Sequence, residues 1–469
     1  MESVLDSDHI EDAVDRLLAP DRPSFRRPPP PSAGPSDDAP DAPAAPAEAR
    51  IETDAAFSRI VLIVPRFGGP DAGTLRETLL ADGAARASRP EDAPRSDVPA
   101  GPGWSASAGP TGGTTAAFVE VLHWDDLARA AVPTAIRSGY RTLLRTVWVY
   151  GRSGAFRRLA RLNRAAASWA FAGAAALVAG ASLAIGLGVL GGRTIATGLG
   201  GPADLIGLPM TPVHFLAGFA GTCAAALVLR LLRSEDGRLR AYERLRPTAY
   251  LASANGAYPP ELERRVSAFA GRIGWALRQP VDEVVVVGHG EGAALAVSAL
   301  AEAVRWGELP PGAPELSLLT LGQTIPLVGF LPDAARLRAD LRDVSLRADL
   351  CWVDVSDPSD ARAFALSDPV AVCGVALDER AGPLVLAAGR TDASQPVRWI
   401  TAAPFRRHDR YLRAPKGSAR DYDWQRVILG PLTLRKFLSG RPPARGRIDL
   451  RATAYASTAR PRPEPDDDD

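Results

Sequence analysis

A short glycine-rich run is the part of the sequence that bears most directly on chemistry. The four valines of residues 284–287 are followed by Gly-His-Gly-Glu-Gly at 288–292 and then by an apolar, alanine-rich segment. A β-branched run, a glycine cluster and an apolar periodic segment predict a strand, a tight turn and a helix. Gly290 stands at the apex of that turn. Glycine has no oxygen or sulfur with which to attack a substrate, so a nucleophilic mechanism centred on this residue is excluded.

This segment resembles the nucleophile elbow of the α/β-hydrolase superfamily, whose pattern is G-x-S-x-G. In that family a serine attacks the substrate, a histidine takes its proton and an acid orients the histidine, in the chain order nucleophile, acid, histidine. The resemblance places Gly290 at the nucleophile position, while Gly288 and Gly292 would let the backbone turn against its neighbours without a Cβ clash. Loss of an essential triad member costs on the order of a million-fold in rate. The resemblance therefore implies a lipase- or esterase-like scaffold that is catalytically degenerate.

The resemblance also implies positions for the acid and the base. The segment that follows residues 350–355 is similar to the acid-bearing loop of the family, with Asp360 as the first choice for the acid and Asp357 as the second. Asx turns formed by the same aspartates are an equally good interpretation of either one alone. His408 is the histidine that comes late enough in the chain to match the base, and Tyr411 lies nearby as in related lipase-like sequences. A lone surface histidine is the alternative.

The loop after the first predicted strand, residues 65–69, takes the place of the family's oxyanion loop. Relatives carry a His-Gly pair there, whose backbone N–H helps to bind the oxyanion, and Arg66 replaces that histidine. Phe67 follows in the same loop. Glu291, the residue after the elbow apex, would offer its backbone N–H to the oxyanion while its side chain points away from the substrate. Arg66, Phe67 and Glu291 are therefore the predicted oxyanion and pocket residues.

Other binding chemistries fit the sequence less well. The glycine run also matches the dinucleotide fingerprint G-x-G-x-x-A through Ala293, but no acid stands about 20 residues later to hold a ribose. A P-loop is excluded because no lysine followed by serine or threonine closes the run. The three cysteines show no paired spacing, so neither a disulfide framework nor a metal site is predicted. We expect no cofactor and a reducing, cytoplasmic environment. The net charge of +1 argues against a nucleic-acid partner.

The predicted elements alternate between strands and helices, which favours an α/β fold with a mostly parallel sheet flanked by helices. Strands are predicted at 59–64, 118–124, 284–287, 316–321, 350–355 and near 399–400, and helices at 75–80, 260–277, 291–305 and 432–439. Residues 56–150 and 250–445 form two parts of one domain, with a flexible insertion at 86–115. The Pro/Ala-rich residues 1–55 and the acidic tail 455–469 are predicted to be disordered.

Two segments without charged residues separate the two parts of the domain. Residues 165–192 and 205–229 are each long enough to cross a bilayer core of about 30 Å, so two transmembrane helices are expected. Arginines precede the first segment and follow the second, and the connecting loop holds only Arg193 and Asp204. The positive-inside rule then predicts a two-pass protein of a bacterial inner membrane with both termini in the cytoplasm. An even number of crossings lets strands from both sides of the hairpin join one sheet.

Taken as a whole, the sequence predicts a membrane-anchored α/β-hydrolase-like protein with a binding or regulatory role. Its expected partners are the membrane and a lipid or ester-like small molecule held in the old substrate pocket. The flanking arginines also suit anionic lipid, although topology alone accounts for them. The alternative function is an active membrane-bound esterase or lipase that uses Asp360 and His408 with an unrecognised nucleophile.

Overall fold

The computed structural model describes residues 57–81, 86–87, 103–108, 115–131, 135–206, 209–234, 241–305, 312–377, 382–388, 409–413 and 422–459. Within these ranges an eight-stranded sheet has the order β2-β3-β4-β1-β5-β6-β7-β8. The strands are β1 (Phe57–Val64), β2 (Arg86–Ala87), β3 (Trp104–Ala108), β4 (Thr115–Val121), β5 (Glu283–His289), β6 (Glu315–Leu321), β7 (Leu350–Ser356) and β8 (Leu384–Ala387). The strands from β4 to β8 in this order pair in parallel, and β2 and β3 add an antiparallel edge. The predicted α/β class with a mostly parallel sheet is confirmed.

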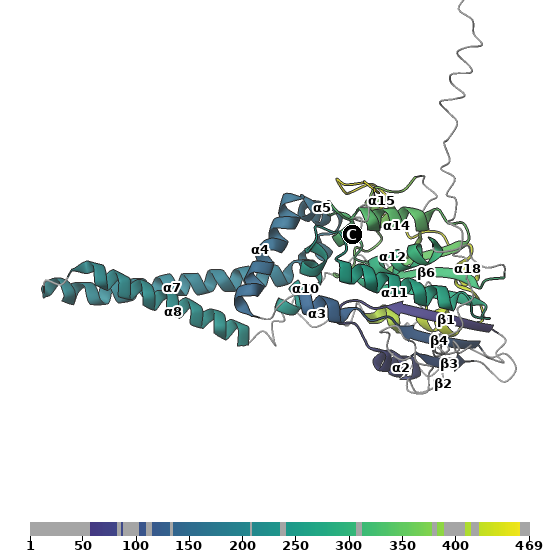
Figure 1. Ribbon diagram of the computed structural model, residues 1–469, viewed down its shortest axis with the longest axis horizontal. Helices are drawn as coiled ribbons and strands as arrows, with labels where there is room; N and C mark the ends of the chain where they lie inside the picture. Colours follow the sequence, from purple (N-terminus) through teal and green to yellow (C-terminus); the bar gives the residue numbers. More distant parts are fainter. Residues whose placement is uncertain are drawn as a thin grey trace, which may run out of the picture. The chain divides into compact units, whose positions relative to one another are not determined.

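Helices cover both faces of the sheet (Figure 1). The helices on the first face are α11 (Pro260–Ala276), α12 (Gly292–Arg305), α13 (Pro326–Gly329), α14 (Ala335–Ser345) and α15 (Pro369–Val372). The helices on the second face are α2 (Ala72–Ala81), α17 (Trp424–Leu429) and α18 (Leu434–Leu438). Val284 and Val286 point to the first face, whereas Val285 and Val287 point to the second. Because β5 is buried on both faces, its residues 284–287 are an unbroken run of apolar residues.

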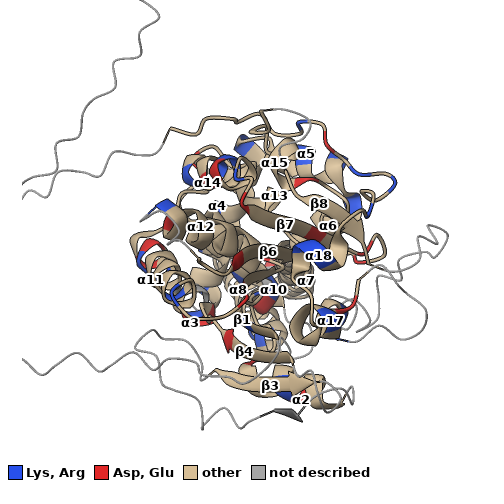
Figure 2. Cartoon of the chain, turned by 90° about the vertical axis from the view of Figure 1, so that its right-hand side faces the viewer, with Lys and Arg blue, Asp and Glu red and all other residues tan. Residues whose placement is uncertain are grey.

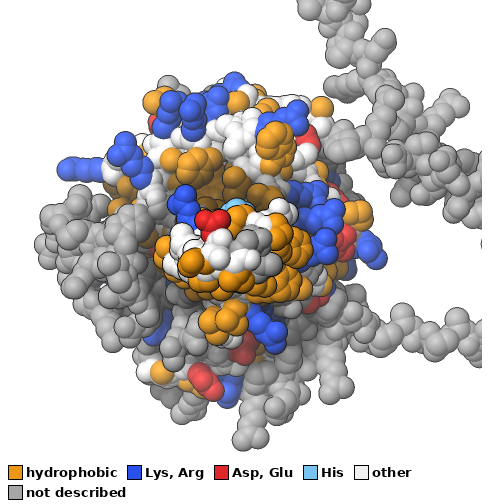
Figure 3. All heavy atoms as spheres, turned by 90° about the vertical axis from the view of Figure 1, so that its left-hand side faces the viewer, with side chains coloured by type: hydrophobic (Ala, Val, Ile, Leu, Met, Phe, Trp, Pro, Cys, Tyr) orange, Lys and Arg blue, Asp and Glu red, His pale blue; other side chains and the backbone are white. Residues whose placement is uncertain are grey.

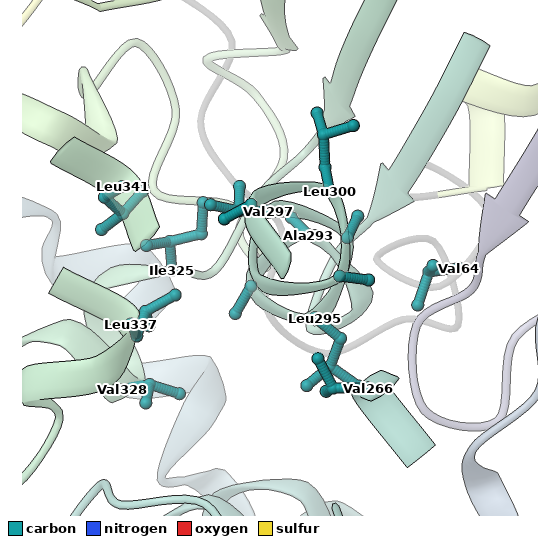
Figure 4. Packing of buried hydrophobic residues seen from close by; sticks show 14 of the residues in the cluster. Val64, Val266, Ala293, Leu295, Val297, Leu300, Ile325, Val328, Leu337 and Leu341 are labelled. Carbon is teal, nitrogen blue, oxygen red and sulfur yellow. The ribbon is translucent and has the colours of Figure 1, made fainter. Parts of the chain in front are cut away.

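The helix that follows β5 lies at the centre of the first layer. Figure 4 shows α12 end on, with Leu295 directed toward Val266 of α11 and Val297 on the side of Ile325. Every residue from Gly292 to Ala301 is buried. Figure 2 shows the molecule from the end away from α7 and α8, and charged side chains of both signs lie on the outer sides of α11 and α14, which enclose α12. The segment that carries the elbow is thus fixed by the core.

Two long apolar helices, α7 (Ala172–Leu205) and α8 (Met210–Ser234), pair along their length and project from the rest of the fold (Figure 1). Both are long and apolar enough to cross a membrane, and an 18-residue stretch in each has a mean hydropathy of 2.0 in α7 and 1.9 in α8. Small residues allow the close pairing: a Cβ on Gly188 would lie 2.6 Å from the carbonyl oxygen of Gly221, and one on Gly192 would lie 3.0 Å from that of Ala217. Gly188 and Gly192 form a GxxxG pair, the spacing that lets membrane helices approach closely.

Four helices join the long pair to the sheet domain: α4 (Ile136–Arg152), α5 (Ala155–Leu162), α6 (Arg164–Ala170) and α10 (Ala241–Ala252). A further short helix, α3 (Asp125–Ala131), follows β4, and a 3-10 turn covers Asp409–Leu412. Leu159 of α5 and Ala166 of α6 belong to the main core, whereas Leu143 of α4 packs with Leu177 of α7 and Leu245 of α10 in a separate cluster. The long helices are therefore rooted in buried structure at their base.

Several described elements lie outside or across the predicted boundaries. The predicted flexible insertion at 86–115 contains β2 and β3, because Trp104 is buried and every residue of β3 pairs with a residue of β4. The core also extends beyond 150, since Leu159 of α5 and Ala166 of α6 pack into it. Within the predicted disordered tail, residues 455–459 are described, and the carbonyl oxygen of Ser457 accepts a hydrogen bond from Arg338 at 2.8 Å.

The bounds of the apolar helices also differ from the prediction. The segment 165–192 is split at Phe171 into α6 and α7, and α7 continues to Leu205 instead of ending in a loop at Arg193. The absence of charge marks apolar residues but not helix ends, and Arg193 is compatible with helix. The predicted second span at 205–229 is replaced by α8, which begins at Met210 and ends at Ser234. The predicted strand near 399–400 and residues 1–55 lie outside the described residues.

Candidate functional site

The sheet has a point at which its connections change face. The chain leaves β1 for α2 on the second face, whereas it leaves the neighbouring β5 for α12 on the first face. Because β1 and β5 are parallel, both exits lie at the same edge of the sheet. Connections that diverge in this way leave a crevice beyond the carboxyl ends of the strands, which is where open α/β sheets bind ligands. The predicted elbow and the predicted oxyanion loop are the two walls of this crevice.

The turn after β5 has a backbone that suits glycine. Gly290 has a φ of 57°, in the left-handed region that residues with a Cβ rarely adopt. Its N–H donates to the carbonyl oxygen of Leu321 at 3.0 Å, and its own carbonyl oxygen accepts from the N–H of Thr324 at 3.3 Å. The apex is thus held between β5 and the segment that follows β6.

Both flanking glycines are needed by the packing. A Cβ on Gly288 would lie 2.5 Å from the Cα of Ala293, and one on Gly292 would lie 2.3 Å from the carbonyl oxygen of Val64. Contacts this short are not tolerated by real side chains, so the helix and the strand could not come together with any other residue here. The expectation that these glycines avoid a Cβ clash is therefore confirmed.

The loop after β1 is fixed by side chains from the end of β4. The indole N–H of Trp124 donates to the carbonyl oxygen of Pro65 at 2.9 Å, and the Trp124 ring meets Phe67 edge to face at 6.1 Å. The backbone N–H of Gly68 donates to a carboxylate oxygen of Asp125 at 3.0 Å. Burial raises the pKa of Asp125. These contacts hold the Phe67 backbone beside the elbow.

A cavity of about 130 Å³ lies in the crevice. It brings together the three predicted pocket residues, Arg66, Phe67 and Glu291, with residues from α6, α10 and the segments after β6 and β7. The other lining residues are Gly68, Trp169, Ala170, Glu243, Arg244, Pro247, Thr248, Thr324, Leu327 and Arg362. Its wall combines three arginines, two glutamates and an apolar surface.

The side chain of Glu291 was expected to point away from the substrate. In the structure Glu291 lines the cavity instead. One carboxylate oxygen accepts the backbone N–H of Phe67 at 3.3 Å, and the other lies 3.9 Å from the guanidinium of Arg362. The N–H that a hydrolase would use for an oxyanion is thus bonded to the protein's own carboxylate. The guanidinium of Arg66 donates to the carbonyl oxygens of Phe67 and Gly68 at 3.0 and 2.9 Å, which fixes it on its own loop.

A tryptophan joins two of the cavity arginines. The ring of Trp169, at the end of α6, lies 5.0 Å from the guanidinium carbon of Arg244 and 5.8 Å from that of Arg362. Cation–π contacts of this kind hold guanidinium groups in place. The hydroxyl of Thr324 is buried in the same wall and has no hydrogen-bond partner among the described residues. Most buried hydroxyls have a hydrogen-bond partner, so this one stands out among the lining residues.

Both predicted acids lie on the loop after β7, away from the cavity lining. Each forms an Asx turn: Asp357 accepts the N–H of Ser359 at 2.8 Å and Asp360 accepts that of Arg362 at 3.0 Å. The second oxygen of Asp360 accepts the hydroxyl of Tyr411 at 3.1 Å. Burial, and then the charges of Asp360 and Asp357, raise the pKa of Tyr411 well above its usual value, so its hydroxyl stays protonated. The structure thus pairs the first-choice acid with a tyrosine.

The predicted base, His408, lies outside the described residues. A described histidine next to the elbow is His289, which is buried and whose ring meets that of Tyr411 edge to face at 6.2 Å. Tyr411 therefore bridges from the acid loop to the strand end beneath Gly290. Among the residues that the structure describes, no group of three or more His, Cys, Asp or Glu side chains is placed to hold a metal ion.

Sequence reasoning missed Trp169, Arg244, Thr324 and Arg362. Trp169 lies in the segment 165–192, which was predicted as the first membrane span, Arg244 lies in α10 beyond the second, and no local pattern connects them with the elbow. Comparison of the chain with protein-family models, with curated proteins and with solved structures finds no match in any of the three.

Proposed function

We propose that this chain is a membrane-anchored, α/β-hydrolase-like protein that binds a lipid or ester-like ligand without turning it over. The observation that carries the proposal is the cavity at the point where the sheet connections change face. It has the walls of a substrate pocket, but the turn beside it carries Gly290. The hydrolase relationship itself rests on the elbow segment and on the divergence of the connections after β1 and β5.

The cavity lining argues against acyl transfer. Among the described lining residues, only Thr248 and Thr324 carry a side-chain hydroxyl, and Thr248 donates its own to the carbonyl oxygen of Ala170 at 3.1 Å. No histidine is among the described residues that line the cavity, so none of these residues is placed to take a proton from Thr324. Glu291 occupies the N–H of Phe67, which a developing oxyanion would need. Binding without reaction is the role that these contacts support.

The wall chemistry indicates a ligand with a polar or anionic head and an apolar body. Arg244, Arg362 and the Thr324 hydroxyl can donate to carboxylate or ester oxygens. Phe67 and Leu327 offer an apolar surface to the rest of the molecule. The Glu291 carboxylate already pairs with the Arg362 guanidinium and the Phe67 N–H. An anionic head group would therefore bind by replacing this carboxylate at both groups.

The two long helices support membrane anchorage by what they expose. Large apolar side chains cover the outside of the pair, among them Leu183, Ile185, Val189, Leu190, Phe215, Phe219, Leu227 and Leu231. A soluble monomer rarely exposes so large an apolar surface. Arg230 and Arg233 near the end of α8, with the arginines of α5 and α6, place the positive flanks on the side of the sheet domain. We therefore assign the sheet domain to the cytoplasmic side of a bacterial inner membrane.

The catalytic part of the proposal is tested with a chromogenic short-chain ester and the purified protein in detergent. The native protein is expected to be inert, and His408→Ala is expected to be inert as well. Gly290→Ser restores an oxygen at the elbow, and turnover by this variant that is lost in a Gly290→Ser, His408→Ala double variant would establish an intact scaffold that lacks its nucleophile. Turnover by the native protein that disappears in His408→Ala would overturn the proposal.

The binding part is tested by thermal stabilisation with hexanoate and its methyl ester in lipid nanodiscs. Thr324→Val removes one neutral hydrogen bond, so we expect about a three- to tenfold loss in affinity for both probes. Arg362→Gln should weaken hexanoate more than the ester because it removes a charge. Arg347→Gln is the matched control, since Arg347 pairs with Asp349 outside the cavity lining. Equal binding by all four proteins would refute the cavity as the ligand site.

A further inference from the structure

The outer face of α4 is apolar where a soluble helix would be polar. Its inner face is buried through Leu143, Val149 and Tyr150. On the opposite side, one turn apart, Leu144 and Trp148 are 70% and 65% exposed. Core packing explains why the residues of the inner face are apolar. It does not explain Leu144 and Trp148, an i, i+4 pair whose side chains contact solvent.

Arginines border this apolar strip. Arg137, Arg141 and Arg152 are exposed on α4. On α5, Phe156 is 45% exposed and the neighbouring Arg157 is exposed. Viewed along the long helix pair from its free end, basic side chains gather around the pair on this side of the protein (Figure 3). Apolar side chains bordered by arginine are typical of helices that lie in the membrane interface.

Contacts with α7 place α4 and α5 at the root of the helix pair. The hydroxyl of Tyr140 donates to the carbonyl oxygen of Leu177 at 3.1 Å. The ring of Phe171, the residue before α7, lies 4.8 Å from the ring of Tyr150 and 5.1 Å from that of Phe156. The exposed Phe156 is therefore continuous with the first turn of the apolar helix.

If α7 and α8 cross a bilayer, these contacts lie at the depth of the lipid head groups. The charge-free part of α8 ends at Arg230, and Arg233 follows one turn later. Gly180 of α7 stands opposite Leu232, since a Cβ on that glycine would lie 3.1 Å from the Leu232 side chain. Leu177, where α4 is attached, lies about one turn further toward the sheet domain. In Figure 1, α4 runs across the direction of the helix pair, so it would lie along a bilayer that the pair crosses.

We propose that Leu144, Trp148 and Phe156, with the exposed arginines of α4 and α5, form a membrane seat that lies in the head-group layer of an anionic leaflet. This inference rests on the proposed membrane insertion of α7 and α8. Trp and Phe favour the interface, where an apolar ring is buried beside polar groups. The arginines attract acidic head groups, and each adds about fivefold to local lipid association. The seat fixes the sheet domain against the membrane, whereas the helix pair alone would leave it free to tilt.

The seat is tested by site-specific fluorescence in nanodiscs made with and without phosphatidylglycerol. The environment-sensitive fluorophore is attached through a cysteine, and lipids with a nitroxide near the head group or deep in the acyl chain serve as quenchers. Native Cys223 is exposed on α8 and reports on the helix pair. Burial raises the pKa of Cys351 to about 11 and that of Cys373 to about 12, so both hold little reactive thiolate at neutral pH.

Two further proteins carry Cys223→Ala and one new cysteine each. Leu144→Cys places the label on the seat. Leu346→Cys is the matched control, because Leu346 is 52% exposed at the end of α14 and belongs to the sheet domain. With head-group nitroxides we expect at least about twofold more quenching at 144 than at 346, and a stronger effect with phosphatidylglycerol. Replacing Arg137, Arg141 and Arg157 by Gln should lower the quenching at 144.

The outcomes separate the seat from the membrane anchor. A label at Cys223 that deep nitroxides do not quench would refute membrane insertion, and the seat with it. Quenching at Cys223 without quenching at 144 would overturn the seat alone. A blue-shifted label at 144 that no lipid nitroxide quenches would also overturn it, since the face would then be covered by protein.

Discussion

The first residue of α12 packs directly against the backbone that follows β1. A Cβ on Gly292 would lie 2.3 Å from the carbonyl oxygen of Val64 and 2.4 Å from that of Pro65. Because both atoms belong to the backbone, Gly292→Ala can be accommodated only by moving the helix or the loop. Overpacking of this kind costs about 1–3 kcal/mol, and two backbone clashes put the substitution at the upper end. For a domain of this size we expect Tm to fall by about 6–12 °C.

The matched control is Gly274→Ala in α11. Its Cβ would have its nearest contact at 3.6 Å, with the flexible guanidinium of Arg278, so no clash opposes it. Alanine is favoured over glycine within a helix by about 0.5–1 kcal/mol, so Tm should stay the same or rise. Far-ultraviolet circular dichroism in one detergent measures both variants. A Gly292→Ala protein that unfolds at the temperature of the native protein would refute the close approach of α12 to the loop that carries Phe67.

Three further substitutions test the fold around the site. Trp124→Phe removes the hydrogen bond to Pro65 and leaves a buried carbonyl unpaired, so the free energy of unfolding in urea should fall by about 1–2 kcal/mol, and an unchanged midpoint would contradict the role of Trp124. Burial raises the pKa of Asp354 to about 8, so the folded state holds a proton that the unfolded state releases near pH 4. The free energy of unfolding should therefore fall as pH rises from about 4 to about 8, and Asp354→Asn should remove this pH dependence. An Asp354→Asn protein with the native pH profile would show that the group is ionised when folded. Gly188→Leu should separate α7 from α8 and lower Tm in detergent, whereas Gly186→Leu, with open space around it, should not; equal effects would argue against close helix packing.

The sequence predicted the strands that are buried on both sides. β1, β5 and β6 are rich in valine, leucine and isoleucine, β7 adds a tryptophan to its apolar residues, and the structure places the apolar residues of these strands alternately in the two cores. The composition of β3, in contrast, is Trp-Ser-Ala-Ser-Ala, with no β-branched residue. Its strand conformation comes from pairing with β4 and from the burial of Trp104, and neither can be seen in a local pattern. β8 has only four residues, Leu384–Ala387, and depends on β7 in the same way.

The candidate site could be predicted only as far as it is local. Gly290 and its neighbours lie in one segment, so the sequence was sufficient to predict the turn and the glycines that it needs. The position of the Glu291 carboxylate could not be predicted, because its partners Phe67 and Arg362 come from distant parts of the chain. The hydrogen bond between Tyr411 and the predicted acid Asp360 could not be predicted either, because only the fold brings these two residues together.

The helices that flank the apolar pair in the chain, α6 and α10, line the cavity, and this would link the proposed anchorage to the proposed binding. Trp169 of α6 comes before the helix pair in the chain and Arg244 of α10 comes after it, yet they meet at 5.0 Å on one wall of the cavity. The backbone supports the same junction, because Thr248 of α10 is hydrogen-bonded to the carbonyl oxygen of Ala170. A tilt of the helix pair at its root would therefore move the cavity wall, since no flexible linker separates Ala170 from Ala172. In the proposed function, the ligand and the membrane would act on the same few residues, so binding in the cavity would favour one orientation of the domain at the bilayer surface.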